Sequence, residues 1–300
     1  MTRVIYKFRF LPLVMVAVLA AVSPMAAQAA TAPGLGLAGN FAVLSAAPGG
    51  GGAVTCTNGT ITGDVGSSGL AASVVQTSCT ISGSIIAPVS AQVVADFNTA
   101  FAAYAAIPCT QTLTGTLASV TLGPGVYCVD AVAKTGTLTL SGPASGVWIF
   151  KVAAVPATTP PTGALTGTNF SVVMAGGGLP CNVNWQVAQA ATMTDSQFVG
   201  TILAGAAITL TRGTFSGNIL AGAAVTITGT TLTGCPGGQN VGKGKEKAHC
   251  NQGVGNGPEG CDPGNSNQGC PSRSNDELGG TPGDPGRQGG NRIDCDVAKS

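Results

Sequence analysis

Apolar and polar residues alternate in short runs along most of the chain, and one run of 17 residues occurs twice in succession. Residues 200–216 have the sequence GTILAGAAITLTRGTFS, and residues 217–233 have the sequence GNILAGAAVTITGTTLT. The alignment extends back to residues 183–199, VNWQVAQAATMTDSQFV. A short fixed period is typical of a solenoid, in which each repeat is one coil that buries its apolar side only against neighbouring coils.

The aligned rows place threonines and larger apolar residues in separate columns. Successive side chains of a strand point to opposite faces, so burying Leu210 turns Thr209 and Thr211 outward. We therefore predict a β-helix whose coils stack by parallel strand pairing. The aligned columns are Thr192, Thr209 and Thr226, then Met193, Leu210 and Ile227, then Thr194, Thr211 and Thr228, and less regular rows occur at 59–66, 80–88, 135–142 and 164–176.

One stretch, SAQVVADFNTAFAAYAAIP, departs from this alternation between Ser90 and Pro108. Its residues Val93 or Val94, Phe97, Phe101 and Tyr104 recur at helical spacing. Serine favours the N-cap of a helix, and proline commonly follows a helix end. The pattern predicts an amphipathic helix that lies along one flank of the solenoid and buries its aromatic stripe there.

The outward threonines are predicted to form a regular two-dimensional grid. Neighbouring strands lie about 4.8 Å apart, and alternate residues of a strand are about 6.6 Å apart. Branching at Cβ restricts the threonine side chain, so little entropy is left to lose on binding. Such a grid could order water and bind a repetitive solid, although threonine is also simply a good strand residue. The candidate contacts are Thr192, Thr194, Thr209, Thr211, Thr226 and Thr228, with Thr137, Thr139, Thr166 and Thr168 as further members.

Charge is scarce, at 8% of residues with a net charge of +1, so no field attracts nucleic acid or an acidic membrane surface. The single histidine, His249, lies near the C-terminus. Acid–base catalysis needs titratable groups close together, and this inventory favours a protein that is not an enzyme and needs no cofactor. Between Thr31 and Cys235 the charged residues are Asp64, Asp96, Asp130, Lys134, Lys151, Asp195 and Arg212.

The two ends of the chain differ from the region between them. Residues 1–29 combine basic residues, an apolar run at 11–22 and small residues before a cleavage site near Ala29, which indicates a secretory signal peptide. We therefore expect a secreted, extracellular protein without membrane insertion, whose solenoid domain spans 30–235. Residues 236–300 are rich in Gly, Asn, Pro and charge, which predicts a tail that is disordered or tethered by disulfides. If the protein is an adhesion module, this tail would be the segment that attaches it to a cell surface or matrix.

Ten cysteines in an exported chain indicate disulfides, and the absence of closely spaced cysteine pairs argues against zinc or another metal. Connectivity cannot be deduced from spacing alone. On the expectation that neighbouring strands carry one cysteine each, the proposed pairs are Cys56 with Cys79, Cys109 with Cys128, and Cys181 with Cys235.

Several stretches together resemble the secreted ice-binding proteins of microbes, the family of the domain of unknown function 3494. They occur in order between about residues 34 and 235, whereas the tail lies outside the resemblance. The matching stretches are LGLAGNFAVLSA (35–46), ITGDVG (61–66), ADFNTAFAAY (95–104), LGPGVYCVD (122–130), GTLTLSG (136–142), VWIFKV (147–152), NVNWQV (182–187), FVGTILAGAAITL (198–210) and GNILAGAAVTI (217–227).

The resemblance implies a right-handed discontinuous β-solenoid of triangular section with one long α-helix packed along one face. It also implies that a flat, helix-free face adsorbs to ice and halts its growth and recrystallisation. Family members carry T-A/G-x-T/N patterns near that face, which TGTN (166–169) and TGTT (228–231) match. TRGT (211–214) departs from the pattern, because Arg212 stands where a small residue is expected.

Two other functions are compatible with the pattern. A cell-surface or matrix adhesion module would bind polysaccharide or protein, and sugar binding usually needs exposed aromatic platforms. Trp148 and Trp185 lie in apolar strand contexts that predict burial. A polysaccharide lyase or hydrolase on a β-helix would need clustered carboxylates or basic residues, which the sequence between 31 and 235 does not group in any motif.

Overall fold

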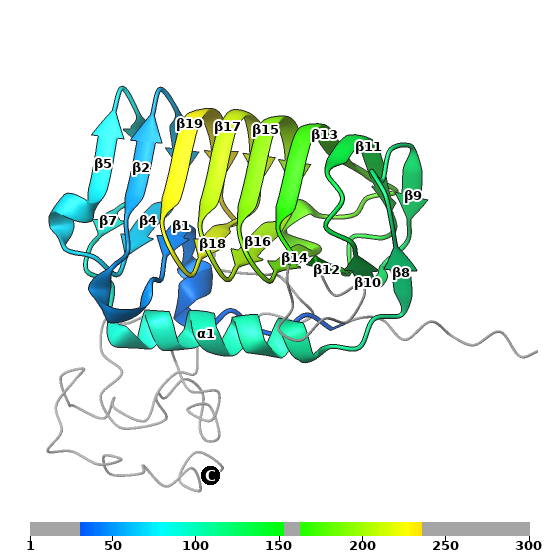
Figure 1. Cartoon of the computed structure of the whole chain (residues 1–300), viewed down its shortest axis with the longest axis horizontal. Helices are drawn as coiled ribbons and strands as arrows, with labels where there is room; N and C mark the ends of the chain where they lie inside the picture. The colour runs from blue at the N-terminus through cyan, green and yellow to red at the C-terminus, as the bar shows by residue number, and fades with distance from the viewer. Residues whose placement is uncertain (1–30, 153–162, 236–300) are drawn as a thin grey trace, which may run out of the picture.

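The computed structural model describes residues 31–152 and 163–235, and these form a β-solenoid with one helix along its side (Figure 1). The predicted signal peptide and tail lie outside the described residues. No helix in the described ranges is long and apolar enough to cross a membrane.

Two stacked sheets of parallel strands build the solenoid. The first contains, in spatial order, β7 (Ile85–Ile86), β4 (Asp64–Ser67), β1 (Phe41–Ser45), β18 (Ile219–Ala221), β16 (Thr201–Ala204), β14 (Val183–Val187), β12 (Trp148–Val152), β10 (Gly125–Val129) and β8 (Gln111–Leu113). The second contains β5 (Val74–Thr77), β2 (Val54–Thr57), β19 (Val225–Thr233), β17 (Ile208–Ser216), β15 (Ala191–Val199), β13 (Leu165–Ala175), β11 (Lys134–Ser141) and β9 (Val120–Leu122), with β3 (Thr60–Thr62) beside β19 and β6 (Thr80–Ile81) beside β3. The described residues also form four short 3-10 helices: η1 (Gly36–Asn40), η2 (Pro48–Gly50), η3 (Ala71–Ser73) and η4 (Pro180–Asn182).

Spatial order and chain order differ, as the predicted discontinuous solenoid requires. The coils formed by residues 41–86 stack on the last coil of the chain, through β1 on β18 and β2 on β19. Helix α1 then carries the chain along the stack to the opposite end, where β8 and β9 begin the remaining coils (Figure 1). The predicted fold class is thereby confirmed.

A column of left-handed residues bends the second sheet along its length. The long strands β13, β15, β17 and β19 turn at Asn169, Asp195, Arg212 and Gly229, whose φ angles are 49°, 50°, 51° and 59°. Asn58 and Ser78 occupy the same position between β2 and β3 and between β5 and β6, at φ 51° and 50°. We call these six residues the corner column. The strand segments before and after it form two faces, here named the first and second open faces.

Buried apolar side chains fill the interior of the coils. Leu210, Ile227, Phe215 and Leu232 are at most 2% exposed, which confirms the predicted inward columns. An aromatic stack centres on Trp185, whose ring centroid lies 3.9 Å from that of Phe150. Trp148 and Trp185 are fully buried, as predicted.

Helix α1 (Ala91–Ala106) covers the outer side of the first sheet (Figure 1). The side chains of Val93, Phe97, Ala100 and Tyr104 are buried in a second apolar cluster, which includes the strand residues Leu44, Ile149, Leu203 and Leu220. The predicted helix is therefore confirmed. Ser90 is its N-cap residue, but its side chain makes no capping hydrogen bond.

Lys151 stabilises the other end of α1. Its ammonium Nζ donates a hydrogen bond of 2.6 Å to the carbonyl oxygen of Ile107, the C-cap residue. A cation there complements the partial negative charge of the helix C-terminus. Burial lowers the pKa of Lys151 from its ordinary value.

The three proposed disulfides are present, and the bonded cysteines have Cα atoms 5.6–5.8 Å apart. Cys56–Cys79 joins neighbouring coils, and Cys181–Cys235 ties the end of the described chain to η4. The three pairs are thus confirmed, but the expectation behind them is wrong: Cys56 and Cys128 lie in strands, whereas Cys79, Cys109 and Cys235 lie in loops and Cys181 lies in η4.

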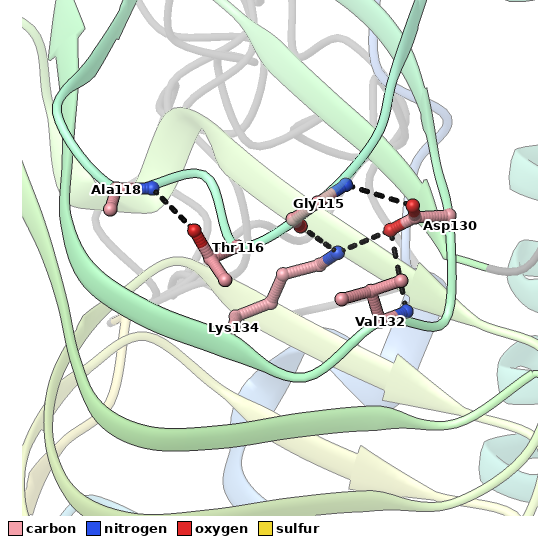
Figure 2. A network of polar contacts seen from close by, with 6 residues as sticks. All are labelled: Gly115, Thr116, Ala118, Asp130, Val132 and Lys134. Atoms are coloured by element: carbon pink, nitrogen blue, oxygen red, sulfur yellow. Dashed lines mark hydrogen bonds and ion pairs between the residues drawn. The ribbon is translucent and has the colours of Figure 1, made fainter.

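A polar network closes the solenoid at the β8 and β9 end (Figure 2). The fully buried Lys134 donates from Nζ to the Gly115 carbonyl oxygen at 2.7 Å and to Asp130 Oδ1 at 2.6 Å. Asp130 also accepts hydrogen bonds from the N–H groups of Gly115 and Val132. Burial opposes ionisation of Asp130, but the bonds from Lys134 and the backbone outweigh it and hold the pKa of Asp130 below its ordinary value.

Replacing Lys134 with Met removes the ammonium group at similar volume. Asp130 is only 16% exposed and would lose its counter-charge, so we expect the free energy of unfolding at pH 7 to fall by about 3 kcal/mol, measured by urea titration.

The same pair predicts a pH dependence. Because the folded pKa of Asp130 is lowered, its contribution is fully present above the unfolded value of about 3.9 and is lost as the pH falls through the folded value. The stability difference between the parent and Lys134→Met should therefore narrow below about pH 4. A difference that stays constant from pH 7 to pH 2.5 would contradict this assignment.

Candidate functional site

Two uninterrupted ladders of outward side chains run along the first open face. Parallel pairing aligns Thr192, Thr209 and Thr226 in one column and Thr194, Thr211 and Thr228 in the next, which confirms the predicted register. Thr166 and Thr168 extend both columns by one coil on β13. Eight of the ten predicted contacts are thus adjacent on one surface.

Three further threonines continue the same columns, and sequence reasoning missed them. Thr55 and Thr57 of β2 pair with Thr226 and Thr228, and Thr77 of β5 pairs with Thr57. Val75 occupies the remaining position. Eleven of the twelve column positions on these six strands are therefore threonine. The missed signal was TCTNGTIT at 55–62, which repeats the threonine alternation of TITGTTLT at 226–233 but lies far from it in the chain.

Thr137 and Thr139 lie elsewhere. They pair with Ser171 and Val173 of β13, beyond the corner residue Asn169, and so belong to the second open face. The T-x-T sequence of these two residues resembles that of the other candidates, which is the reason for expecting them on the same face. In their coil, however, the strand before the corner carries no threonine pair. It carries Lys134, which pairs with Gly167 and is buried.

The first open face is held rigid by the buried core beneath it and by hydrogen bonds between coils. The residues between the paired threonines, Met193, Leu210 and Ile227, are fully buried, and each coil hydrogen-bonds to the next along the ladder. Neighbouring threonine rows are consequently about 4.8 Å apart, and the two columns about 6.6 Å apart. The surface offers a repeated pattern of one hydroxyl and one methyl group per position.

Arg212 lies at the edge of this grid. It belongs to the corner column, and its Nε and Nη2 atoms donate to Asp195 Oδ1 and Oδ2 of the adjacent coil at 2.6 and 2.8 Å. These hydrogen bonds lower the pKa of Asp195 and raise that of Arg212. The expected interruption by Arg212 therefore falls on the corner, where the two charges neutralise each other.

The two family-like tetrapeptides occupy different registers. TGTN places Thr166 and Thr168 on the first open face and Asn169 at the corner. TGTT begins at Thr228, the coil position equivalent to Thr168, and crosses the corner at Gly229. The feature shared by β13, β15, β17, β19 and β2 is thus the T-x-T pair before a left-handed residue, rather than the tetrapeptide.

Arg212→Asn should be tolerated. Asparagine adopts a left-handed backbone more readily than arginine, and Asn58 and Asn169 already occupy the corner column. We expect a melting temperature no lower than that of the parent, measured by circular dichroism, despite loss of the exposed ion pair. A clear fall would show that the Asp195 contact, and not the backbone preference, dominates at this corner.

The described aspartates each make a local structural contact. Asp64 accepts from the Ser84 N–H, and Asp96 accepts from the Leu37 N–H and from Gln92. The backbone bond from Leu37 and the Gln92 bond lower the pKa of Asp96. Among residues 31–152 and 163–235, no three His, Cys, Asp or Glu side chains are grouped as a metal site would require.

Comparison with known proteins gives this surface a context. A family model described as ice-binding-like matches residues 48–233. The chain belongs to the ice-binding-like family. It is 30% identical over 215 residues to ice-binding protein K3-B1 of Typhula ishikariensis, covering 63% of this chain and 83% of that protein. It is 34% identical over 190 residues to an ice-binding protein of Nostoc sp. (strain HG1), covering 61% and 65% respectively.

Solved structures of this family share the fold. The ice-binding protein of the Antarctic ascomycete Antarctomyces psychrotrophicus aligns with a TM-score of 0.58 at 32% identity, covering 68% of this chain and 98% of that one. An ice-binding protein from an Antarctic biological consortium aligns with a TM-score of 0.60 at 30% identity, covering 71% and 96%.

Proposed function

We propose that this chain is a secreted ice-binding protein that adsorbs to ice through its first open face and thereby inhibits ice growth and recrystallisation. The observation that carries the proposal is the pair of threonine columns, unbroken except at Val75 across six adjacent strands. Membership of the ice-binding-like family supports it.

The grid suits a solid made of ordered water. Threonine hydroxyl groups can occupy the positions of water oxygens in an ice lattice. The methyl groups between them form no hydrogen bonds, so neighbouring water molecules bond mainly to one another. The side chains are restricted by Cβ branching, and their backbone is fixed by parallel pairing, so little entropy is lost on adsorption. An unpaired charged side chain would keep its own hydration shell and disturb ordered water. The charged residues nearest the grid, Asp195 and Arg212, form an ion pair with each other at the corner column.

This function needs no chemical step. A crystal front that meets adsorbed protein must grow around it, which raises the local curvature of the ice and opposes further growth. The structural contacts of Asp64, Asp96, Asp130 and Asp195 give none of them an evident catalytic partner, which supports a non-enzymatic role.

The adhesion alternative is less well supported. A sugar-binding surface usually presents aromatic side chains, whereas Trp148 and Trp185 are fully buried and pack inside the coils. Attachment through residues 236–300 is compatible with ice binding, because this segment follows the last described residue, Cys235, and includes none of the threonines of the first open face. We propose that the N-terminal signal directs export and that the tail provides such an attachment.

The test is thermal hysteresis of the full chain beside Thr209→Tyr/Thr226→Tyr. Tyrosine at two neighbouring grid positions would hold the face away from a flat lattice. We expect the activity to fall by about tenfold or more, as a loss of 1.4 kcal/mol in binding free energy would produce.

The matched control is Thr99→Tyr, which makes the same change at an exposed threonine on α1. It should keep the parent activity, and all variants should keep the parent melting temperature. An inactive parent that is folded would refute the proposed function. An active Thr209→Tyr/Thr226→Tyr variant would move the ice contact to another surface.

A further inference from the structure

The second open face carries its own ordered hydroxyl pattern beyond the corner column. Thr60 of β3 pairs with Thr80 of β6 on one side and with Thr231 of β19 on the other. Thr231 pairs in turn with Thr214 of β17. A parallel column contains Thr62, Thr233 and Ser216. We call these seven residues the second threonine patch.

The pattern arises because three coils repeat threonine pairs on both sides of the corner. Residues 226–233 are TITGTTLT, residues 55–62 are TCTNGTIT, and residues 209–216 are TLTRGTFS. In each, the first T-x-T pair faces the first open face, and the second pair, T-x-T or T-x-S, faces the second. The fourth residue is the left-handed corner.

Hydrogen bonds fix the angle between the two faces. Thr230 is buried directly after the corner, and its Oγ1 donates at 3.1 Å to the carbonyl oxygen of Thr228 before it. Ser196 makes the same bond to Thr194 on β15, at 2.9 Å. The fully buried Ile61 and Leu232 support the second patch from inside. Each face is therefore a rigid surface with its own orientation.

The second patch has clear limits. Its columns end at Gln197 and Val199 of β15, where hydroxyl groups give way to an amide and a valine. Helix α1 packs on the first sheet and not on this face. Thr60, Thr62, Thr80, Thr214, Thr231 and Thr233 are exposed, and Ser216 is partly exposed.

We propose that the second threonine patch is a separate ice-adsorbing surface, continuous with the first across the corner column, and that it binds a different set of crystal planes. This inference rests on the proposed function. The inference is supported by two features of the patch. The same hydroxyl-bearing side chains recur at the same coil spacing on a face of different orientation, and no residue of the patch is charged. One molecule thus presents two grids that cannot both lie flat on one plane.

The experiment is plane labelling of single-crystal ice hemispheres by the full chain fused to a fluorescent protein. The variants are Thr214→Tyr/Thr231→Tyr in the second patch and Thr209→Tyr/Thr226→Tyr on the first open face. The matched control is Thr121→Tyr, because Thr121 is exposed on the second open face but lies on β9, beyond the patch. Circular dichroism establishes that each variant is folded.

We expect the parent and Thr121→Tyr to label two sets of planes. Thr214→Tyr/Thr231→Tyr should lose one set and keep the other, and the first-face variant should show the reverse loss. A folded second-patch variant that labels every plane labelled by the parent would overturn the inference and leave the proposed function intact. A parent that labels no plane would overturn the proposed function itself.

If the double substitution prevents folding, Thr60→Lys/Thr80→Lys provides an independent test on other strands of the patch. A charge on each exposed position should repel a water lattice by retaining its hydration. The same loss of one set of planes is expected, and retention of both sets would overturn the inference.

Discussion

Parallel hydrogen bonding between successive coils is the constraint on which this structure depends. A single coil has too little apolar surface to fold alone, so each coil must stack on a neighbour with its inward residues aligned. Met193, Leu210 and Ile227 inside, and Thr192, Thr209 and Thr226 outside, are two results of that one requirement. The same alignment that stabilises the core sets the spacing of the surface.

The two ends of the solenoid differ in how their last coil is covered. At the β8 and β9 end, Lys134 and Asp130 form an ion pair with each other, and both also hydrogen-bond to the backbone of Gly115. These contacts satisfy the charges buried at the last coil. At the other end Ile85 and Val75 remain 43% and 47% exposed. Charge is therefore used where the interior needs closing, and it is absent from the threonine grids.

Much of this architecture could be predicted from the sequence, because a repeat converts local alternation into long-range pairing. The inward and outward columns at 183–233, the helix that follows Ser90, and the three disulfides are confirmed. The roles of these threonines as ice contacts stay predictions. The signal peptide and the tail lie outside the described residues.

What the sequence could not reveal depends on spatial order. Thr55, Thr57 and Thr77 join the grid only because the N-terminal coils stack on β19, and no local pattern states which coil will be neighbour to which. Thr137 and Thr139 resemble grid residues in sequence, yet they follow the corner instead of preceding it. The corner itself is hidden because Asn, Asp, Ser, Arg and Gly all occupy it.

We propose that an ordered threonine surface makes this protein part of a growing ice front. The most direct measurement is ice-affinity partitioning, in which ice is grown slowly from a dilute solution of the full chain and the protein in the ice and in the remaining liquid is quantified. We expect strong enrichment of the protein in the ice over a co-dissolved protein of similar size. Exclusion of the folded chain into the liquid, to the same extent as the co-dissolved protein, would contradict it.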